Sequence, residues 1–204
     1  MSGSLNVSST NPMLRADGSR RVVITGTGAV SPAGVGVQAL WDAVSTGECC
    51  IGPIERFDTS DFEVHNAGEV RGYDGTEHGL SKKEARRFER FVQYAITASD
   101  EALAEAGLDM ESEDPTRVGV VYGSGIGGID ELQKGFFTLH DKGPSRVNPL
   151  FVPTMISNIV SGCLAIRYGM QGECINVVTA CATGTHCMGQ ALRDSRHGYI
   201  DVTL

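Results

Sequence analysis

Short apolar runs alternate along the chain with segments in which apolar residues recur every three or four positions. The runs are typical of buried strands and lie at residues 21–25, 118–122, 174–179 and 199–204. The helical spacing is clearest where Ser81 and Glu84 form a capping box, and this helix is expected to continue to Gly107. Further helices are predicted near residues 37–45, 130–140, 155–168 and 181–197, with an edge strand near 68–71 and an exposed loop over 143–153. Strands that alternate with helices indicate an α/β fold with a largely buried sheet.

The composition is that of an ordinary globular protein, with 41% hydrophobic and 21% charged residues. The 26 glycines among 204 residues indicate many tight turns and close backbone approaches. A formal net charge of −8 argues against a general binder of nucleic acid or anionic membranes. No apolar run approaches the roughly 18 residues that a membrane-spanning helix needs.

The first 20 residues are rich in Ser, Asn and Gly and contain no apolar segment of the kind found in secretory signals. We therefore predict a disordered leader over 1–20 and one folded region over 21–204. Without an export signal, the six cysteines are expected to stay reduced, as in the cytoplasm. Their spacing contains no C-x2-C pair, so neither a metal nor another cofactor is expected. The last apolar run reaches Leu204 without a polar ending, which is expected of a chain cut within a strand.

Gly123, Gly125 and Gly128 follow a predicted strand and precede a helix, which is the setting of a dinucleotide-binding turn. The acidic residue expected about 20 positions later is missing, because the sequence GPSRVNP stands there. A packing turn, in which a strand passes close under a helix, fits the glycines as well and is favoured.

Cys181 follows a buried strand directly and opens a helix rich in small residues. The free N–H groups at the start of a helix stabilise a thiolate and can hold an oxyanion, so the position suits acyl transfer. A small buried core residue is the alternative, and position alone leaves both open. Cys163, Cys174 and Cys187 are predicted to lie in the core. His186 lies about 140° around the helix from Cys181 and is expected to contact a neighbouring element rather than act as its base.

Lys83, Arg86, Arg87 and Arg90 have the spacing of one helix face. Residues 81–90 contain five basic side chains and two acidic ones, against the sign of the whole chain. Such a face is often simply solvated, and docking of an acidic partner is the other interpretation.

In these segments the sequence resembles the β-ketoacyl-acyl carrier protein synthases, and among them the type II enzymes of bacterial fatty-acid synthesis. The matching segments run in the family's order and are RRVVITGTGAVSPAG, SKKEARRFERF, GSGIGGIDE, PLFVPTMISNIVSG, INVVTACATGTH and HGYIDVTL. The resemblance implies a thiolase-like fold of two similar halves, each with a five-stranded mixed sheet and helices on both faces, and a homodimer. Residues 21–204 would be the N-terminal half.

The resemblance also implies roles for individual residues. Cys181 would take an acyl chain from acyl carrier protein, and malonyl-carrier protein would then lose carbon dioxide and attack that thioester. Ile126 and Phe151 match positions of the acyl pocket. Basic positions that meet the acidic carrier are matched by Lys83, Arg86, Arg87 and Arg146.

The family's two catalytic histidines, a lysine and a second oxyanion donor belong to the other half, and nothing in residues 1–204 matches them. We therefore expect residues 1–204 alone to be inactive. Two alternatives are a thiolase- or chalcone-synthase-type enzyme acting on coenzyme A thioesters, and a non-catalytic chain-length partner of a polyketide synthase pair. The basic face disfavours the first, and the presence of Cys181 disfavours the second.

Overall fold

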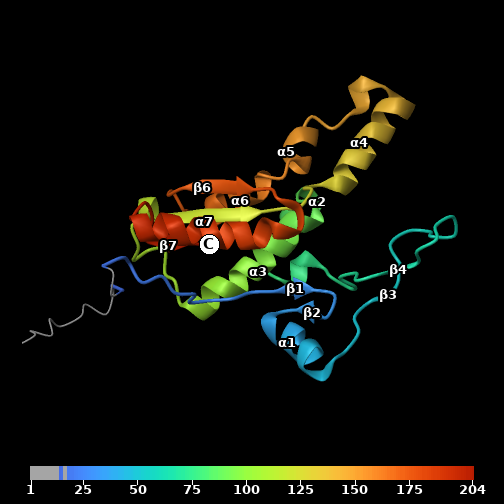
Figure 1. The fold of residues 1–204 in the computed structure, drawn as a ribbon. Helices are drawn as coiled ribbons and strands as arrows, with labels where there is room; N and C mark the ends of the chain where they lie inside the picture. Colours follow the sequence, from blue (N-terminus) through green and yellow to red (C-terminus); the bar gives the residue numbers. More distant parts are fainter. Residues whose placement is uncertain (1–13, 16–17) are drawn as a thin grey trace, which may run out of the picture.

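Three parallel strands form the centre of the computed structural model, which describes residues 14–15 and 18–204 (Figure 1). Their order in the sheet is β6-β5-β7, so β5 has a partner on each side. The strands are β5 (Val118–Gly123), β6 (Cys174–Val177) and β7 (Val202–Thr203). The predicted α/β class is confirmed, and the described part of the chain supplies three strands to this sheet where the resemblance implies five.

Helices cover both faces of the sheet, as predicted. Successive residues of a strand point to opposite faces, and Val118 and Val120 belong to the core cluster that β5 shares with two helices on one face. On the other face, a Cβ added to Gly123 would lie 2.2 Å from the Thr183 methyl group. The two helices on the first face are α3 (Arg90–Ala106) and α6 (Ile159–Tyr168), and the helix on the second face is α7 (Thr183–His197).

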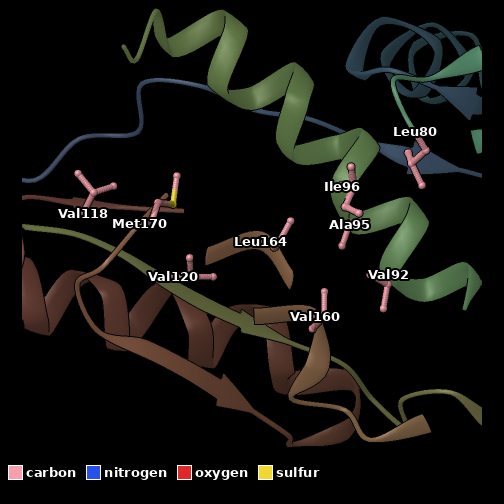
Figure 2. Packing of buried hydrophobic residues seen from close by; sticks show 9 residues of the cluster. All are labelled: Leu80, Val92, Ala95, Ile96, Val118, Val120, Val160, Leu164 and Met170. Atoms are coloured by element: carbon pink, nitrogen blue, oxygen red, sulfur yellow. The ribbon is translucent and has the colours of Figure 1, made fainter. Parts of the chain in front are cut away.

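The main core lies between α3, α6 and β5. Figure 2 shows the buried side chains of these elements gathered between the three backbones. Val120, Val160 and Leu164 are completely inaccessible to solvent. Side chains of this size contribute about 1.5–3 kcal/mol each when fully buried, so this cluster fixes α6 and α3 on the sheet.

The predicted capping box is present, but the single long helix predicted after it is wrong. Ser81 Oγ accepts a hydrogen bond from the Glu84 N–H, and Glu84 Oε2 accepts one from the Ser81 N–H. Helix α2 (Lys82–Arg87) then ends at Phe88, whose backbone is extended, and α3 begins at Arg90. The cause is the Gln93 side chain, whose Nε2 donates to the carbonyls of Ala85 at 3.0 Å and Phe88 at 2.7 Å. These bonds satisfy carbonyls that otherwise need partners at a helix end.

Residues 21–25 do not form the predicted strand. Val23 and Ile24 are 60% and 70% exposed, and no strand of the described chain lies beside them to pair with. The segment that follows crosses α3 at very short range instead. A Cβ on Gly28 would lie 1.8 Å from the Ala98 carbonyl oxygen, so only glycine permits this crossing.

Two carboxylates of α3 hold the crossing segment in place. Glu101 accepts hydrogen bonds from the N–H groups of Ala29 and Val37, at 2.9 and 2.8 Å. Glu105 accepts from the N–H and the hydroxyl of Thr27, and these bonds lower the pKa of Glu105. The bond to Val37 also satisfies the first turn of α1 (Val37–Thr46), which ends at Gly47 as predicted.

The remaining elements surround this core. The edge strand predicted near 68–71 is absent, and its neighbourhood instead holds a short antiparallel pair, β3 (Gly52–Pro53) with β4 (Asn66–Ala67). A second pair joins β1 (Val30–Ser31) and β2 (Gly34–Val35). Helices α4 (Ile129–Lys142) and α5 (Phe151–Met155) project from the body (Figure 1). The exposed loop predicted over 143–153 is therefore wrong in part, because α5 begins inside it, and the predicted helix 155–168 is shortened to α6 because Ile156 is extended.

Most of the predicted leader, residues 1–13 and 16–17, lies outside the described residues. Leu14 and Arg20 form an isolated antiparallel bridge. Arg20 also pairs with Asp201, next to β7, and Arg117 Nε donates to the same carboxylate at 2.8 Å. The hydrogen bonds from Arg117 and then from Arg20 hold the pKa of Asp201 far below its usual range. Within the described chain, no helix is both long and apolar enough to cross a membrane.

Candidate active site

Cys181 lies at the turn between β6 and α7, in a single-turn 3-10 helix formed by Ala180–Ala182. Its side chain is exposed, so the alternative of a buried core cysteine is wrong. Cys181 follows the carboxyl end of the parallel strand β6 and comes just before the start of α7. Cys181 is therefore an accessible thiol at the start of a helix, the arrangement predicted for a nucleophile.

The backbone of this turn is strained next to the thiol. Among the described residues other than glycine, Ala180 alone has a positive φ, of 50°. Such a conformation costs about 1–3 kcal/mol and persists only when surrounding contacts hold it. One such contact runs from the Thr179 N–H to Thr183 Oγ1 at 2.9 Å, and the Thr183 side chain is buried.

His186 gives the turn a second contact. Its Nδ1 lies 2.7 Å from Thr179 Oγ1, and no hydrogen bond joins His186 to Cys181 in the described structure. His186 is thus not joined to Cys181, as predicted, but its partner lies in the turn before its own helix rather than on a neighbouring element. The brace formed by Thr179, Thr183 and His186 was missed by the sequence reasoning, although two threonines four residues apart around a cysteine are a pattern that could have indicated it.

The other cysteines of the C-terminal part differ in accessibility. Cys163 and Cys187 are half-buried, and burial raises the pKa of both thiols. The prediction that Cys174 lies in the core is wrong, because this residue is exposed. The reason is its place at the start of β6, which is an edge strand of the sheet.

Packing explains three of the four glycines in the turn that follows β5, Gly123, Gly127 and Gly128. A Cβ on Gly128 would lie 2.8 Å from the Thr154 carbonyl oxygen, and one on Gly127 would lie 2.7 Å from that of Met155. Gly123 is equally crowded, against Thr183 of α7. These close approaches account for Gly123, Gly127 and Gly128, whereas a Cβ added to Gly125 would meet nothing within 4 Å.

The two residues that match the acyl pocket lie on the projecting part of the molecule. Ile126 is 72% exposed, in the turn between β5 and α4. Phe151 opens α5, and its ring packs on Gly135 of α4, where an added Cβ would come within 2.2 Å of it. Neither residue lines the hollow beside Phe88 and Cys163 or the groove beside α2, so a role in an acyl pocket stays a prediction.

Three of the four residues expected to dock the carrier meet at one groove. Lys83, Arg86 and Arg87 line an open groove of about 560 Å³ beside α2, together with Arg90 from α3. Arg146 lies apart from them, in the 3-10 helix Pro144–Arg146 after α4, and does not line this groove. Although α2 ends before α3 begins, Arg90 of α3 lines the same groove as the basic residues of α2.

The charges of the groove are not equally available. Arg56 and Lys134 also line it, but they pair with Asp130 and Glu131 at 2.7 and 2.8 Å. In contrast, no ion pair with a described carboxylate involves Lys83, Arg86 or Arg87 of α2. Helix α2 therefore presents unneutralised positive charge to solvent.

Comparison with known proteins decides the family. Residues 19–204 match the sequence profile described as "Beta-ketoacyl synthase, N-terminal domain". The chain belongs to the β-ketoacyl synthase family. This match extends over the central sheet, Cys181 and the basic groove, so the resemblance found in the sequence motifs is confirmed.

Individual relatives of this β-ketoacyl synthase chain agree with the profile. It is 44% identical over 185 residues to the 3-oxoacyl-[acyl-carrier-protein] synthase 2 of Vibrio cholerae, covering 91% of this chain and 44% of that protein. The protein of the same name from Staphylococcus aureus strain COL is 43% identical over 185 residues, with the same 91% and 44% covered. The chain thus spans less than half the length of these curated relatives.

A solved structure shows the same fold. The ishigamide ketosynthase/chain length factor has a TM-score of 0.81 and 28% sequence identity, with 91% of this chain and 46% of that one covered. The β-ketoacyl synthase fold predicted from the motifs is confirmed by this likeness.

Proposed function

We propose that this chain provides the nucleophile and the carrier-docking groove of a condensing enzyme of fatty-acid elongation. The observation that carries the proposal is the exposed Cys181 at a braced, strained turn between a parallel strand and a helix. The chain is similar to proteins named 3-oxoacyl-[acyl-carrier-protein] synthase 2, which supports an acyl carrier protein as the source of the acyl group.

The reaction proceeds in two steps at Cys181. In the first, the Cys181 sulfur attacks the acyl carbonyl carbon, and the bond from that carbon to the carrier's sulfur breaks. The carrier leaves as a free thiol, and the acyl group remains on Cys181 as a thioester. In the second, malonyl-carrier protein loses carbon dioxide, and the electron pair of the broken bond attacks the acyl carbon. The thiolate of Cys181 leaves, and the product is a 3-oxoacyl-carrier protein that is two carbons longer.

The groove supports the carrier as partner. Lys83, Arg86 and Arg87 are exposed cations without carboxylate partners in the described chain, although the chain as a whole has a net charge of −8. An acidic protein surface would be attracted to this patch and oriented by it. Arg146, on the projecting part, would add a further contact to the same partner.

The proposed function is tested by condensation with the intact protein, meaning this chain together with the second half that the family resemblance implies, because residues 1–204 alone are expected to be inactive. Acyl-carrier protein and malonyl-carrier protein are mixed with enzyme, and 3-oxoacyl-carrier protein is measured by intact-mass spectrometry. The wild type should form this product, and Cys181→Ala should form none. Cys174→Ala is the matched control, because Cys174 is also exposed but lies at the far end of β6, and it should retain activity.

Other outcomes would support other functions. Equal turnover of acyl-coenzyme A and acyl-carrier protein would favour a thiolase-type enzyme and contradict the role of the groove. Undiminished product from Cys181→Ala would contradict the role of Cys181 as nucleophile.

The homodimer and the cytoplasmic location stay predictions. Helix α4 buries none of its residues and offers exposed Phe136 and Phe137 to a second copy. Sedimentation of the intact protein would test the homodimer.

A further inference from the structure

The basic helix α2 cannot hold its own position. It has only six residues, and none of them is buried. Isolated helices of this length are unstable in water, because the cost of nucleation is not recovered over so few hydrogen bonds. The positions of Lys83, Arg86 and Arg87 must therefore be fixed by contacts from the rest of the molecule.

One contact of this kind comes from Arg167, at the end of α6. Its Nη1 donates to Glu84 Oε1 on α2 at 2.8 Å, and its Nη2 donates to the carbonyl of Gly79 at 3.0 Å, just before α2. The two oxygens of the Glu84 carboxylate thus accept hydrogen bonds from different partners. Its Oε2 completes the capping box with Ser81, while its Oε1 faces Arg167.

The other side of the Arg167 guanidinium is tied to the core helices. Nη2 also lies 3.4 Å from Asp100 Oδ2 on α3, and Tyr168 donates its hydroxyl to Asp100 Oδ1 at 2.7 Å. Only 23% of the Arg167 side chain is exposed. A planar guanidinium with several N–H donors can hold these partners at once, which a lysine ammonium on its flexible chain does less well.

Neither Arg167 nor Glu84 lines the groove beside α2. We propose that Arg167 is a positioning residue for carrier binding: it anchors α2 to α6 and α3 from behind and so fixes Lys83, Arg86 and Arg87 in the geometry that an acidic carrier protein meets. This inference rests on the proposed function. Arg167 itself touches neither the carrier nor the acyl chain.

Positioning and simple charge attraction make opposite predictions at Glu84. Glu84→Gln keeps the capping box, because glutamine serves at this position as well as glutamate. The variant removes one negative charge next to the docking cations, so attraction alone would tighten carrier binding. It also breaks the ion pair with Arg167, so loss of positioning would weaken carrier binding.

The experiment measures steady-state kinetics of the intact protein with acyl-carrier protein as the varied substrate. Arg167→Ala and Glu84→Gln should each raise KM for the carrier substrate by about three- to tenfold, the effect of losing one partly exposed anchoring contact. The value of kcat should stay near that of the wild type. A small acyl thioester without the carrier, such as acyl-N-acetylcysteamine, should react at the wild-type rate with both variants. Arg193→Ala is the control, because this arginine is exposed on α7 and donates a hydrogen bond to Gln190 of its own helix.

The effects of the two variants on KM should also not be additive, because both variants remove the contact between Arg167 and Glu84. The double variant should raise KM about as much as either single one. A lowered KM in Glu84→Gln, or an unchanged KM in both variants, would overturn the inference while leaving the proposed function intact. If Arg167→Ala loses the small-thioester activity as well, its fold is damaged, and the milder Glu84→Gln decides. A wild type without condensation activity would reject the proposed function and this inference together.

Discussion

Gly28→Ala is expected to destabilise the protein strongly, because Gly28 sits where the backbone crosses α3. An alanine Cβ would lie 1.8 Å from the Ala98 carbonyl oxygen, whereas real Cβ contacts below 3.0 Å essentially do not occur. The segment must therefore move away from α3 by at least about 1 Å, because a backbone carbonyl inside a helix cannot yield as a flexible side chain does.

The expected loss of stability follows from the hydrogen bonds that this movement breaks. Glu101 accepts hydrogen bonds at 2.9 and 2.8 Å from the N–H groups of Ala29 and Val37, both partly buried. Lengthening them by 1 Å takes them beyond hydrogen-bond range. Each bond to a charged acceptor contributes about 1.5–3 kcal/mol, so the loss of both amounts to about 3–6 kcal/mol.

The assay is urea unfolding of the intact protein, followed by circular dichroism. Gly47→Ala is the matched control, because Gly47 has a φ of 72° and nothing within 4 Å of an added Cβ. Gly47→Ala should lower the free energy of unfolding by only about 1–2 kcal/mol, the cost of an alanine in the left-handed conformation. If Gly28→Ala proves no more destabilising than Gly47→Ala, the close crossing over α3 is refuted.

Three further predictions concern charge, reactivity and pH. The double charge reversal Arg86→Glu with Arg87→Glu should lower kcat/KM for acyl-carrier protein by about tenfold or more and reduce its salt dependence, because exposed charges steer encounter. The rate with a small acyl thioester is the comparison, and an equal loss there would contradict a docking role. Limited iodoacetamide treatment followed by peptide mass spectrometry should label the exposed Cys181 before Cys163, whose pKa is raised by burial, and the reverse order would count against the assignment. Asp201→Asn should destabilise the protein near neutral pH. The pKa of Asp201 is depressed in the folded state, so its stabilisation is complete above the unfolded value of about 3.9 and is lost as the pH falls. The stability difference from wild type, measured by urea unfolding, should therefore shrink in acid; a constant difference from pH 7 to pH 3 would contradict this linkage.

Features that depend on neighbouring residues were predictable from the sequence. The capping box of Ser81 and Glu84, the helix end at Gly107 and the strand β5 all follow from local patterns, and the structure confirms them. The place of Cys181 between a strand and a helix was predictable in the same way, but its exposure was not, because the local pattern left an accessible thiol and a buried core residue both open.

Features that depend on distant contacts were not predictable. The spacing of apolar residues cannot show that the Gln93 side chain takes the carbonyls of Ala85 and Phe88 and so ends α2. It also cannot show that residues 21–25 have no strand beside them in the described part of the chain, or that Arg167 reaches Glu84 across 83 positions of sequence. At α2 and at Arg167 a tertiary contact decides the local structure, and at residues 21–25 the lack of a pairing partner does.

The most direct test of the account is to locate the acyl group on the protein. The intact protein is mixed with acyl-loaded carrier protein in the absence of malonyl-carrier protein, then digested and analysed by peptide mass spectrometry. The account predicts the acyl mass on the peptide that contains Cys181, and its absence in Cys181→Ala. An acyl group on another residue, or no acylated peptide while the carrier still loses its acyl chain, would contradict Cys181 as the nucleophile.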